Sequence, residues 1–159
     1  MLRKSGYAFA VFALLFTVLT PAASAAEPPR LGGVGADAVW SVLYNRAHPD
    51  FCLANQHPRV FNFGGCTGQY NDQYWTVNAY SQIVNYHHGG CLTAHAAGNV
   101  FTFDCGPRFR DSLWRNYQGI PGMLENVEHP GRCLAGHTNG NVFLFTCTPG
   151  FTDQYWGAY

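Results

Sequence analysis

Two kinds of side chain recur in this sequence at fixed positions and have the chemistry to hold a hydroxyl-rich ligand. An aspartate stands three residues before a tryptophan at Asp72, Asp111 and Asp153. Phenylalanines alternate with other residues just before a cysteine, as Phe61 and Phe63, Phe101 and Phe103, and Phe143 and Phe145. A carboxylate accepts two hydroxyl hydrogens at once, and an exposed aromatic ring stacks on the apolar C–H face of a sugar.

Both sets also have a structural interpretation. Alternation puts the two rings of each pair on one side of a strand, so all six rings could instead be interior. The aspartates could cap the turn before each tryptophan. The tryptophans themselves are predicted to be core residues, because three equivalent large aromatics converging on one axis would fill the floor of a barrel. They are Trp75, Trp114 and Trp156.

Catalysis finds little support in the residue types. Beyond an N-terminal leader only Ser41, Ser81 and Ser112 remain as serines, and the chain has no glycine-rich phosphate loop or paired-glutamate motif. We therefore expect no enzyme and no cofactor. One local exception to the symmetry of the sequence is the stretch 106–115, GPRFRDSLWR, where three arginines cluster.

The seven histidines raise the possibility of a metal site, which we discount. His48, His88 and His129 occupy equivalent places in successive copies of a repeat, so they should lie far apart rather than converge on one ion. No metal site is expected.

A segment written out three times must position all these residues. It runs from a first cysteine to a second one 14 positions later and to a tryptophan 9 positions beyond, at 52–75, 91–114 and 133–156. The repeat of about 40 residues is therefore the unit of the fold, with repeats at about 38–75, 76–114 and 115–159. An insertion at 118–122, QGIPG, lengthens the third repeat.

All six cysteines lie in these repeats, and a copied unit would most simply carry its own bridge. The predicted disulfides are Cys52–Cys66, Cys91–Cys105 and Cys133–Cys147. Each would close a loop of about 15 residues, which the chain-entropy model values at roughly 3 kcal/mol. Zinc is disfavoured because cysteine ligands usually stand two to four residues apart.

Short β-rich segments separated by turn residues predict an all-β domain with little helix. The first expected strand lies in the alternating stretch 38–45. The others are expected at 60–63, 75–80, 83–85, 100–103, 123–126, 142–145 and 155–159.

The first 25 residues resemble a signal peptide. Arg3 and Lys4 precede an apolar run of 13 residues, and Ala23-Ser24-Ala25 is a typical cleavage site. Residues 26–37 then form a linker and 38–159 the domain of a secreted protein. Without the leader the chain has seven arginines, no lysine and nine acidic residues, which gives a formal net charge of −2. This balance disfavours nucleic acid and anionic membranes as partners, and membrane insertion is not expected.

The repeated pattern CL...VFxFxC...QxW resembles the ricin-type β-trefoil lectin domain. Its QxW motif is present at Gln73 to Trp75 and at Gln154 to Trp156, whereas the middle repeat has Ser112 in place of glutamine. The resemblance covers about residues 38–159 and implies a closed β-trefoil of three repeats that binds carbohydrate without catalysis.

The resemblance also implies where sugars would bind. An aromatic platform two residues before the second cysteine corresponds to Phe103 and Phe145, and to Phe63 with a shift of one. The position three residues before each tryptophan, which is Asn-like in the family, holds the three aspartates of this chain. The family has a further aspartate two residues after the first cysteine, where this chain has Ala54, Thr93 and Ala135. Polar residues four after the first cysteine, including Gln56, are further candidates. The candidate carbohydrate-binding residues are Phe63, Asp72 and Gln73; His95, Phe103 and Asp111; and His137, Asn139, Phe145, Asp153 and Gln154.

Three functions follow as hypotheses. The first is a secreted, non-catalytic module with up to three weak glycan sites, of which repeat 3 retains the most candidate residues. The second is a protein-binding trefoil, such as a protease inhibitor acting through the loop 106–112 or the insertion 118–122. The third is a stable scaffold that has lost sugar binding, because the missing aspartates remove an acceptor worth about 1 to 3 kcal/mol.

Overall fold

The computed structural model describes residues 38–159, so the predicted signal peptide and linker lie outside the described residues. In this part of the chain each repeat forms four strands. Repeat 1 has β1 (Ser41–Asn45), β2 (His48–Gln56), β3 (Arg59–Gly64) and β4 (Tyr74–Val77). Repeat 2 has β5 (Ile83–Asn85), β6 (Cys91–Ala94), β7 (Val100–Phe103) and β8 (Trp114–Asn116). Repeat 3 has β9 (Leu124–Asn126), β10 (Arg132–Gly136), β11 (Val142–Thr146) and β12 (Trp156–Ala158).

Helix in the described residues is limited to four single 3₁₀ turns. Three of them, η1 (Asn71–Gln73), η2 (Arg110–Ser112) and η4 (Thr152–Gln154), each come just before a tryptophan. The fourth, η3 (Tyr117–Gly119), lies at the insertion. None of these turns is long or apolar enough to cross a membrane. The prediction of an all-β domain is confirmed.

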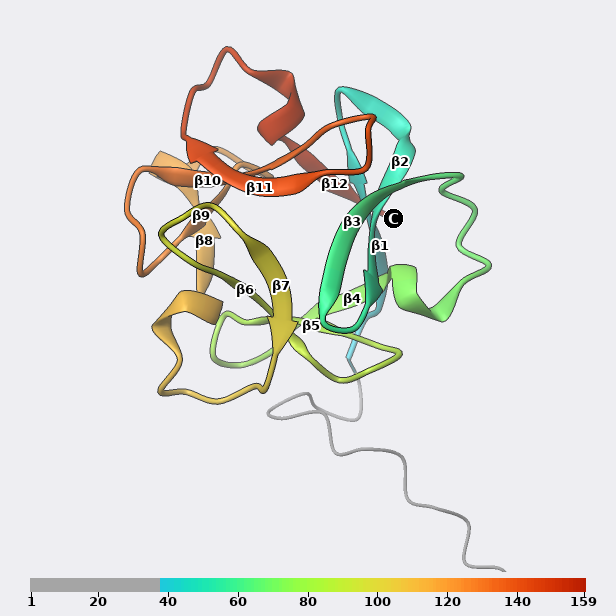
Figure 1. Cartoon of the computed structure of the whole chain (residues 1–159), viewed down its shortest axis with the longest axis horizontal. Coiled ribbons are helices and arrows are strands. Elements are labelled where there is room, and N and C mark those ends of the chain that lie inside the picture. The colour runs from blue at the N-terminus through green and yellow to red at the C-terminus, as the bar shows by residue number, and fades with distance from the viewer. Residues whose placement is uncertain (1–37) are drawn as a thin grey trace, which may run out of the picture.

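The strands close into a barrel. One sheet runs β12-β1-β2-β3-β7-β6-β5-β4, with β1 also paired to β4, and a second runs β11-β10-β9-β8. The hairpins β2–β3, β6–β7 and β10–β11 surround a common centre (Figure 1). This is the threefold β-trefoil that the resemblance implies, and closure leaves few unpaired sheet edges.

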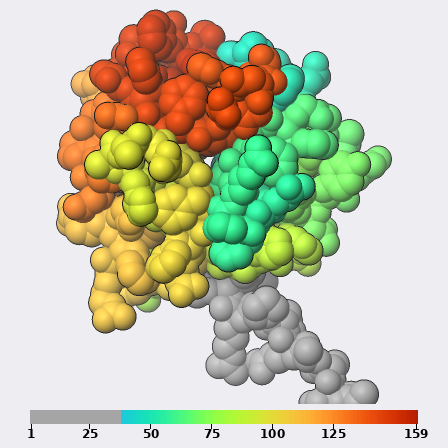
Figure 2. All heavy atoms as spheres, viewed as in Figure 1, coloured from blue at the N-terminus to red at the C-terminus, as the bar shows by residue number. Residues whose placement is uncertain are grey.

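Backbone hydrogen bonds join the three hairpins in a ring. Asn62 donates its N–H to the Gly140 carbonyl at 2.9 Å, and Thr102 donates to Pro58 at 2.8 Å. Leu144 completes the ring by donating to Gly98 at 2.8 Å. In each case a strand of one repeat bonds to the hairpin turn of another. Figure 2 shows the three hairpins meeting around the centre of this face.

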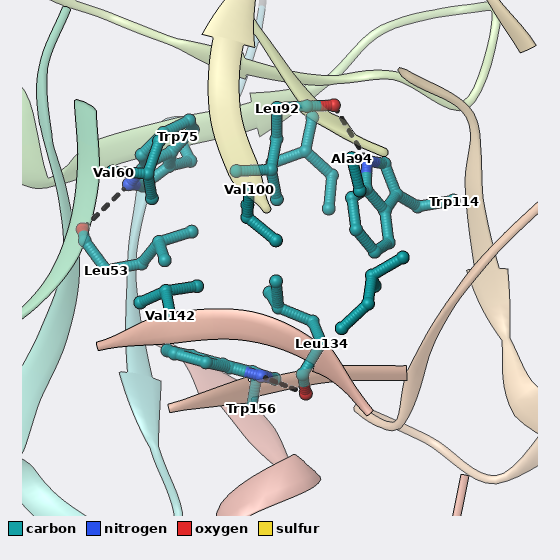
Figure 3. Packing of buried hydrophobic residues seen from close by; sticks show 12 residues of the cluster. Leu53, Val60, Trp75, Leu92, Ala94, Val100, Trp114, Leu134, Val142 and Trp156 are labelled. Carbon is teal, nitrogen blue, oxygen red and sulfur yellow. Dashed lines mark hydrogen bonds between the residues drawn. The ribbon is translucent and has the colours of Figure 1, made fainter. Parts of the chain in front are cut away.

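The three repeat tryptophans occupy the core, as predicted. Trp75, Trp114 and Trp156 are at most 4% exposed and belong to one apolar cluster. Each indole N–H donates to the carbonyl of the leucine 22 positions earlier, at 2.8, 2.9 and 3.1 Å (Figure 3). The ring is thus buried with its one polar atom satisfied, which favours it as a structural anchor.

The disulfide prediction is also confirmed. Cys52–Cys66, Cys91–Cys105 and Cys133–Cys147 are bonded, with Cα–Cα distances of 5.2, 5.1 and 4.9 Å. Each bridge ties the first strand of a hairpin to the chain that follows the second.

The strands that carry the first cysteines, β2, β6 and β10, were not predicted. Their central residues, 52–55, 91–94 and 133–136, are buried without interruption. A strand covered on both faces shows no alternation of apolar and polar residues, so the pattern of period two is missing. The strand expected at 75–80 was too long, since β4 ends at Val77 and a turn follows.

Candidate functional site

Each aspartate is the middle residue of the 3₁₀ turn, η1, η2 or η4, that follows the second cysteine of its repeat. We call the segments 69–72, 108–111 and 150–153 the aspartate loops. In each one a buried asparagine from the neighbouring repeat donates its side-chain amide to the aspartate's backbone carbonyl. The pairs are Asn85 with Asp72 at 2.8 Å, Asn126 with Asp111 at 2.7 Å and Asn45 with Asp153 at 2.7 Å. The loops are therefore fixed at the junctions between repeats.

The side-chain carboxylates of the three aspartates do not cap the 3₁₀ turns. The residues before the three 3₁₀ turns make no side-chain capping hydrogen bond. The carboxylates of Asp72 and Asp111 have no hydrogen-bond partner among residues 38–159, so the capping interpretation is not supported. Asp153 accepts a 3.1 Å hydrogen bond from His137 Nε2, and its side chain is 23% exposed. The structure therefore brings together two predicted site residues of repeat 3.

Repeats 1 and 2 each have an open pocket of about 590 Å³ beside the aspartate loop. Its wall combines the residue four after the first cysteine, the aspartate loop, and a histidine from the next repeat. In repeat 1 these elements contribute Gln56, Tyr70, Asp72 and His88. In repeat 2 they contribute His95, Phe109, Asp111 and His129. The predicted candidates Gln56, Asp72, His95 and Asp111 thus line two equivalent pockets.

The phenylalanine pairs are neither wholly interior nor wholly exposed. Phe103 and Phe145 are 47% and 45% exposed, whereas Phe63 is half-buried. Their partners Phe61, Phe101 and Phe143 are also half-buried. The rings expected to act as platforms in repeats 2 and 3 are accessible.

A third ring completes each aromatic cluster, and the sequence analysis missed it. Tyr70 lies 6.0 Å from Phe63, Phe109 lies 5.7 Å from Phe103, and Phe151 lies 6.3 Å from Phe145, between ring centroids. A usable signal was present, because an aromatic residue stands four positions after every second cysteine and two before every aspartate. Each aspartate loop therefore carries a ring and a carboxylate together.

The positions that lack the family's aspartate lie opposite the half-buried phenylalanines on the neighbouring strand. Ala54, Thr93 and Ala135 are buried and pair in register with Phe61, Phe101 and Phe143, respectively. Cross-strand partners share one face of the sheet, so each small side chain leaves room for the ring opposite it. Ala54 and Ala135 offer no acceptor, and the hydroxyl of Thr93 is used within the protein, where it donates to the Cys91 carbonyl at 2.9 Å.

Two predicted contact residues need correction. Gln73 and Gln154 are fully buried and cannot reach a ligand at the surface. Gln154 instead accepts a hydrogen bond from the Thr148 N–H at 2.9 Å and donates to the Thr146 carbonyl at 2.8 Å. In repeat 3 the glutamine of the QxW motif therefore braces the chain that leads into the aspartate loop, whereas the buried side-chain amide of Gln73 has no hydrogen-bond partner among residues 38–159. Asn139 remains exposed and accepts a hydrogen bond from the Asn141 N–H in the turn after β10.

In repeat 2 a glutamine from outside the QxW position makes the corresponding hydrogen bonds. Ser112 stands where the motif glutamine should be, and the buried Gln82 donates its side-chain amide to Ser112 Oγ at 2.7 Å and to the Gly106 carbonyl at 2.8 Å. Gln82 faces Leu113 across a β-bridge, as Met123 faces Tyr155 in repeat 3. The lost glutamine has thus been replaced by one on the adjacent segment.

The pocket of repeat 1 is rich in histidine. Partial burial, together with the neighbouring His87 and His57, lowers the pKa of His88 below its ordinary value, although Asp72 acts in the opposite direction. His88 therefore favours its neutral form more than a free histidine does. Among residues 38–159 no group of three or more histidine, cysteine or acidic side chains is arranged to hold a metal ion.

A closed threefold barrel with an aspartate loop at each repeat junction defines a β-trefoil domain. A model of the ricin-type beta-trefoil lectin domain matches residues 39–156, and the chain belongs to this family. No curated protein matches the chain in sequence at a significant level.

Solved structures share the fold at low identity. A non-toxic homologue of type II RIPs from Momordica charantia (bitter gourd), in complex with α-methyl-D-galactoside, has a TM-score of 0.63 and 14% identity. That match covers 77% of this chain and 48% of the other. The β-trefoil lectin of the Vibrio vulnificus hemolysin/cytolysin, with N-acetyl-D-lactosamine bound, has a TM-score of 0.61 and 16% identity, covering 77% and 95% of the two chains.

A third structure, GalNAc-T7 with UDP, GalNAc and Mn²⁺, has a TM-score of 0.60 and 22% identity. The match covers 74% of this chain and 21% of that one. The chain therefore corresponds to about a fifth of GalNAc-T7 and to about half of the bitter gourd protein.

Proposed function

We propose that this protein is a secreted, non-catalytic carbohydrate-binding module with up to three weak glycan sites. The family to which the chain belongs supports carbohydrate binding. The observation that carries the proposal is the repeated placement of an aromatic ring and a carboxylate on one loop at each repeat junction. Secretion rests on the leader-like sequence of residues 1–25 and is tested by finding the mature protein outside the cell with Ala26 at its N-terminus.

Each site would bind a sugar by two kinds of contact. The apolar face of the sugar packs against the loop ring and the adjacent platform ring, while its hydroxyls donate to the aspartate carboxylate. Because the buried acceptor at Ala54, Thr93 and Ala135 is missing, each site should be weak on its own. Three sites on one rigid domain compensate through avidity on a glycan that carries many copies of the sugar.

The protein-binding alternative is less well supported by the two loops that would carry it. In the insertion, Ile120 packs with Tyr117 against a buried cluster that contains Met123 and the cysteines of the third disulfide. The insertion is therefore anchored to the domain rather than free to enter a protease. The loop 106–112 forms part of the pocket of repeat 2, which favours a small ligand over a flat protein surface.

A glycan array with the mature protein tests the proposal. Replacing Phe145, Phe103 and Phe63 by alanine, singly and together, should weaken binding in steps, by about tenfold for each site that contributes. Tyr80→Ala is a matched control, because Tyr80 is 48% exposed but lies in the turn after β4, outside the aspartate loops, and lines neither pocket. An array without signal, or one on which the triple variant binds like the unchanged protein, would refute glycan binding at these sites.

A further inference from the structure

The three aspartate loops share their ring and their carboxylate but differ in the residues between and before them. Their sequences are QYND in repeat 1, RFRD in repeat 2 and GFTD in repeat 3. Only the middle loop carries charge besides its aspartate, through Arg108 and Arg110. The same backbone frame thus presents a cationic loop in one repeat and neutral loops in the other two.

The two arginines differ in their surroundings. Arg110 donates from Nε to Glu128 at 3.0 Å, so its charge is matched within the protein. Arg108 is exposed and lines the pocket, and it has no hydrogen bond or ion pair with any described residue. A guanidinium presents parallel N–H groups in a planar fork that suits a carboxylate. Arg108 is therefore available to an anionic group that enters the pocket.

The remaining wall of this pocket fixes how such a group would sit. Asp111 lines the same pocket, and its carboxylate has no hydrogen-bond partner among residues 38–159. A ligand anion placed against Asp111 would be repelled, whereas a ligand hydroxyl would be accepted there. Phe109 stands between the two charged residues in the chain and supplies an apolar surface. The pocket therefore offers an anion position at Arg108, a hydroxyl position at Asp111 and an apolar surface at Phe109.

We propose that the pocket of repeat 2 binds an acidic sugar, with its carboxylate on Arg108, its hydroxyls on Asp111 and its ring against Phe109. The equivalent sites of repeats 1 and 3 bind neutral sugars. This inference rests on the proposed function and adds the class of sugar and the repeat that selects it.

The chain offers a reciprocal experiment. Arg108→Gly with Arg110→Thr gives repeat 2 the loop of repeat 3, and Gly150→Arg with Thr152→Arg gives repeat 3 the loop of repeat 2. The second exchange fits the structure, because a Cβ built at Gly150 meets no atom within 4 Å. Arg108→Gln alone, with the residue found in repeat 1, removes the charge while leaving the ion pair of Arg110 intact.

The ligands are the methyl glycosides of glucuronic and galacturonic acid, each compared with the neutral glucoside or galactoside that differs only at C6, and sialic acid methyl glycoside. Two-dimensional NMR titration gives the affinity and identifies the responding repeat. At least one acid should bind at repeat 2 more tightly than its neutral counterpart, or than neutral galactoside in the case of the sialoside. Arg108→Gln should lower the affinity of repeat 2 for that acid by about tenfold or more, since a charge-assisted hydrogen bond is lost. The transplanted loop should create a preference for the same acid in repeat 3.

The outcomes separate this inference from the function on which it rests. Neutral sugars that bind while no acid is preferred at repeat 2 would overturn the inference alone. So would a preference that persists in Arg108→Gln, provided that the variant unfolds at the same temperature as the unchanged protein. Failure of every glycan, in these titrations and on the array, would overturn both.

Discussion

At the scale of single residues, the carboxylate of Glu125 is buried and held by two hydrogen bonds. This side chain is 6% exposed and accepts hydrogen bonds from Arg115 Nε at 2.7 Å and from the Gly131 N–H at 2.6 Å. Burial acts to raise the pKa of Glu125. The hydrogen bonds from Arg115 and Gly131 and the charge of Arg115 outweigh it, so the pKa is lowered.

A lowered carboxyl pKa has a defined consequence for stability. Glu125 stabilises the fold above the ordinary carboxyl value, 4.5, and that contribution is lost as the pH falls through the lower pKa of the folded state. Glu125→Gln should therefore reduce the free energy of unfolding at pH 7 by about 1 to 2 kcal/mol, a modest value because Arg115 is largely exposed. Urea unfolding at pH 7 and at pH 3 measures the difference, which should shrink at the lower pH.

The exposed ion pair of Arg110 and Glu128 is the control for this prediction. Both side chains are well solvated, so Glu128→Gln should change the unfolding free energy by less than about 0.5 kcal/mol at either pH. A destabilisation by Glu125→Gln that stays the same at pH 3 would contradict the assignment of the effect to the carboxylate charge.

At the scale of elements, the aspartate loops of repeats 2 and 3 are each braced by a buried glutamine, which comes from a different place in the chain in the two repeats. Gln154 braces the loop of repeat 3 from within the QxW motif, whereas Gln82 braces that of repeat 2 from the neighbouring segment. Repeat 3 has Met123 at the position of Gln82 and Gln154 at the position of Ser112, so the glutamine occupies a different one of these two positions in each repeat.

This exchange predicts a strong coupling. Gln82→Met leaves the Gly106 carbonyl without its donor and should cost about 1 to 3 kcal/mol of stability. Adding Ser112→Gln recreates the arrangement of repeat 3 and should recover most of that loss, although Ser112→Gln alone overpacks a buried site. A double-mutant cycle from thermal unfolding measures the coupling, and simple additivity of the two changes would contradict the interpretation.

The sequence predicted those features that depend on spacing. Constant intervals between cysteines and tryptophans identified the repeat, the disulfides and the core. It could not distinguish the exposed rings of Phe103 and Phe145 from the half-buried ring of Phe63, because alternation reports a shared face and not whether that face is covered. It also misassigned Gln73 and Gln154, because the motif does not reveal that the fold buries both side chains. Only Gln154 is matched there by the backbone of Thr146 and Thr148.

At the scale of the whole molecule, no repeat is independent of the others. Each hairpin bonds to another in the central ring, and each aspartate loop is held by an asparagine from the adjoining repeat. The core tryptophans of all three repeats also belong to one apolar cluster. We therefore expect the domain to unfold as a single unit, as small domains generally do.

Removing one disulfide tests this cooperativity. The double variant Cys91→Ala with Cys105→Ala should lower the stability of the entire domain by about 3 kcal/mol. The transition followed by tryptophan fluorescence should still coincide with the one followed by circular dichroism. The same change at Cys133 and Cys147 gives the comparison for another repeat, and a separate early transition confined to repeat 2 would show that the repeats unfold independently.

The first strand of the domain, β1, pairs with the last strand, β12, so the domain is closed by hydrogen bonds where the covalent chain is open. Val42 and Tyr159 exchange backbone hydrogen bonds, so the last residue lies beside the first strand. A short polar linker could therefore join residue 38 to Tyr159, and the barrel could be reopened at Gly119, where a Cβ would meet no atom within 4 Å. The native starting point is then only one of several equivalent places to begin the same topology, and a circular permutant would keep all three junctions intact.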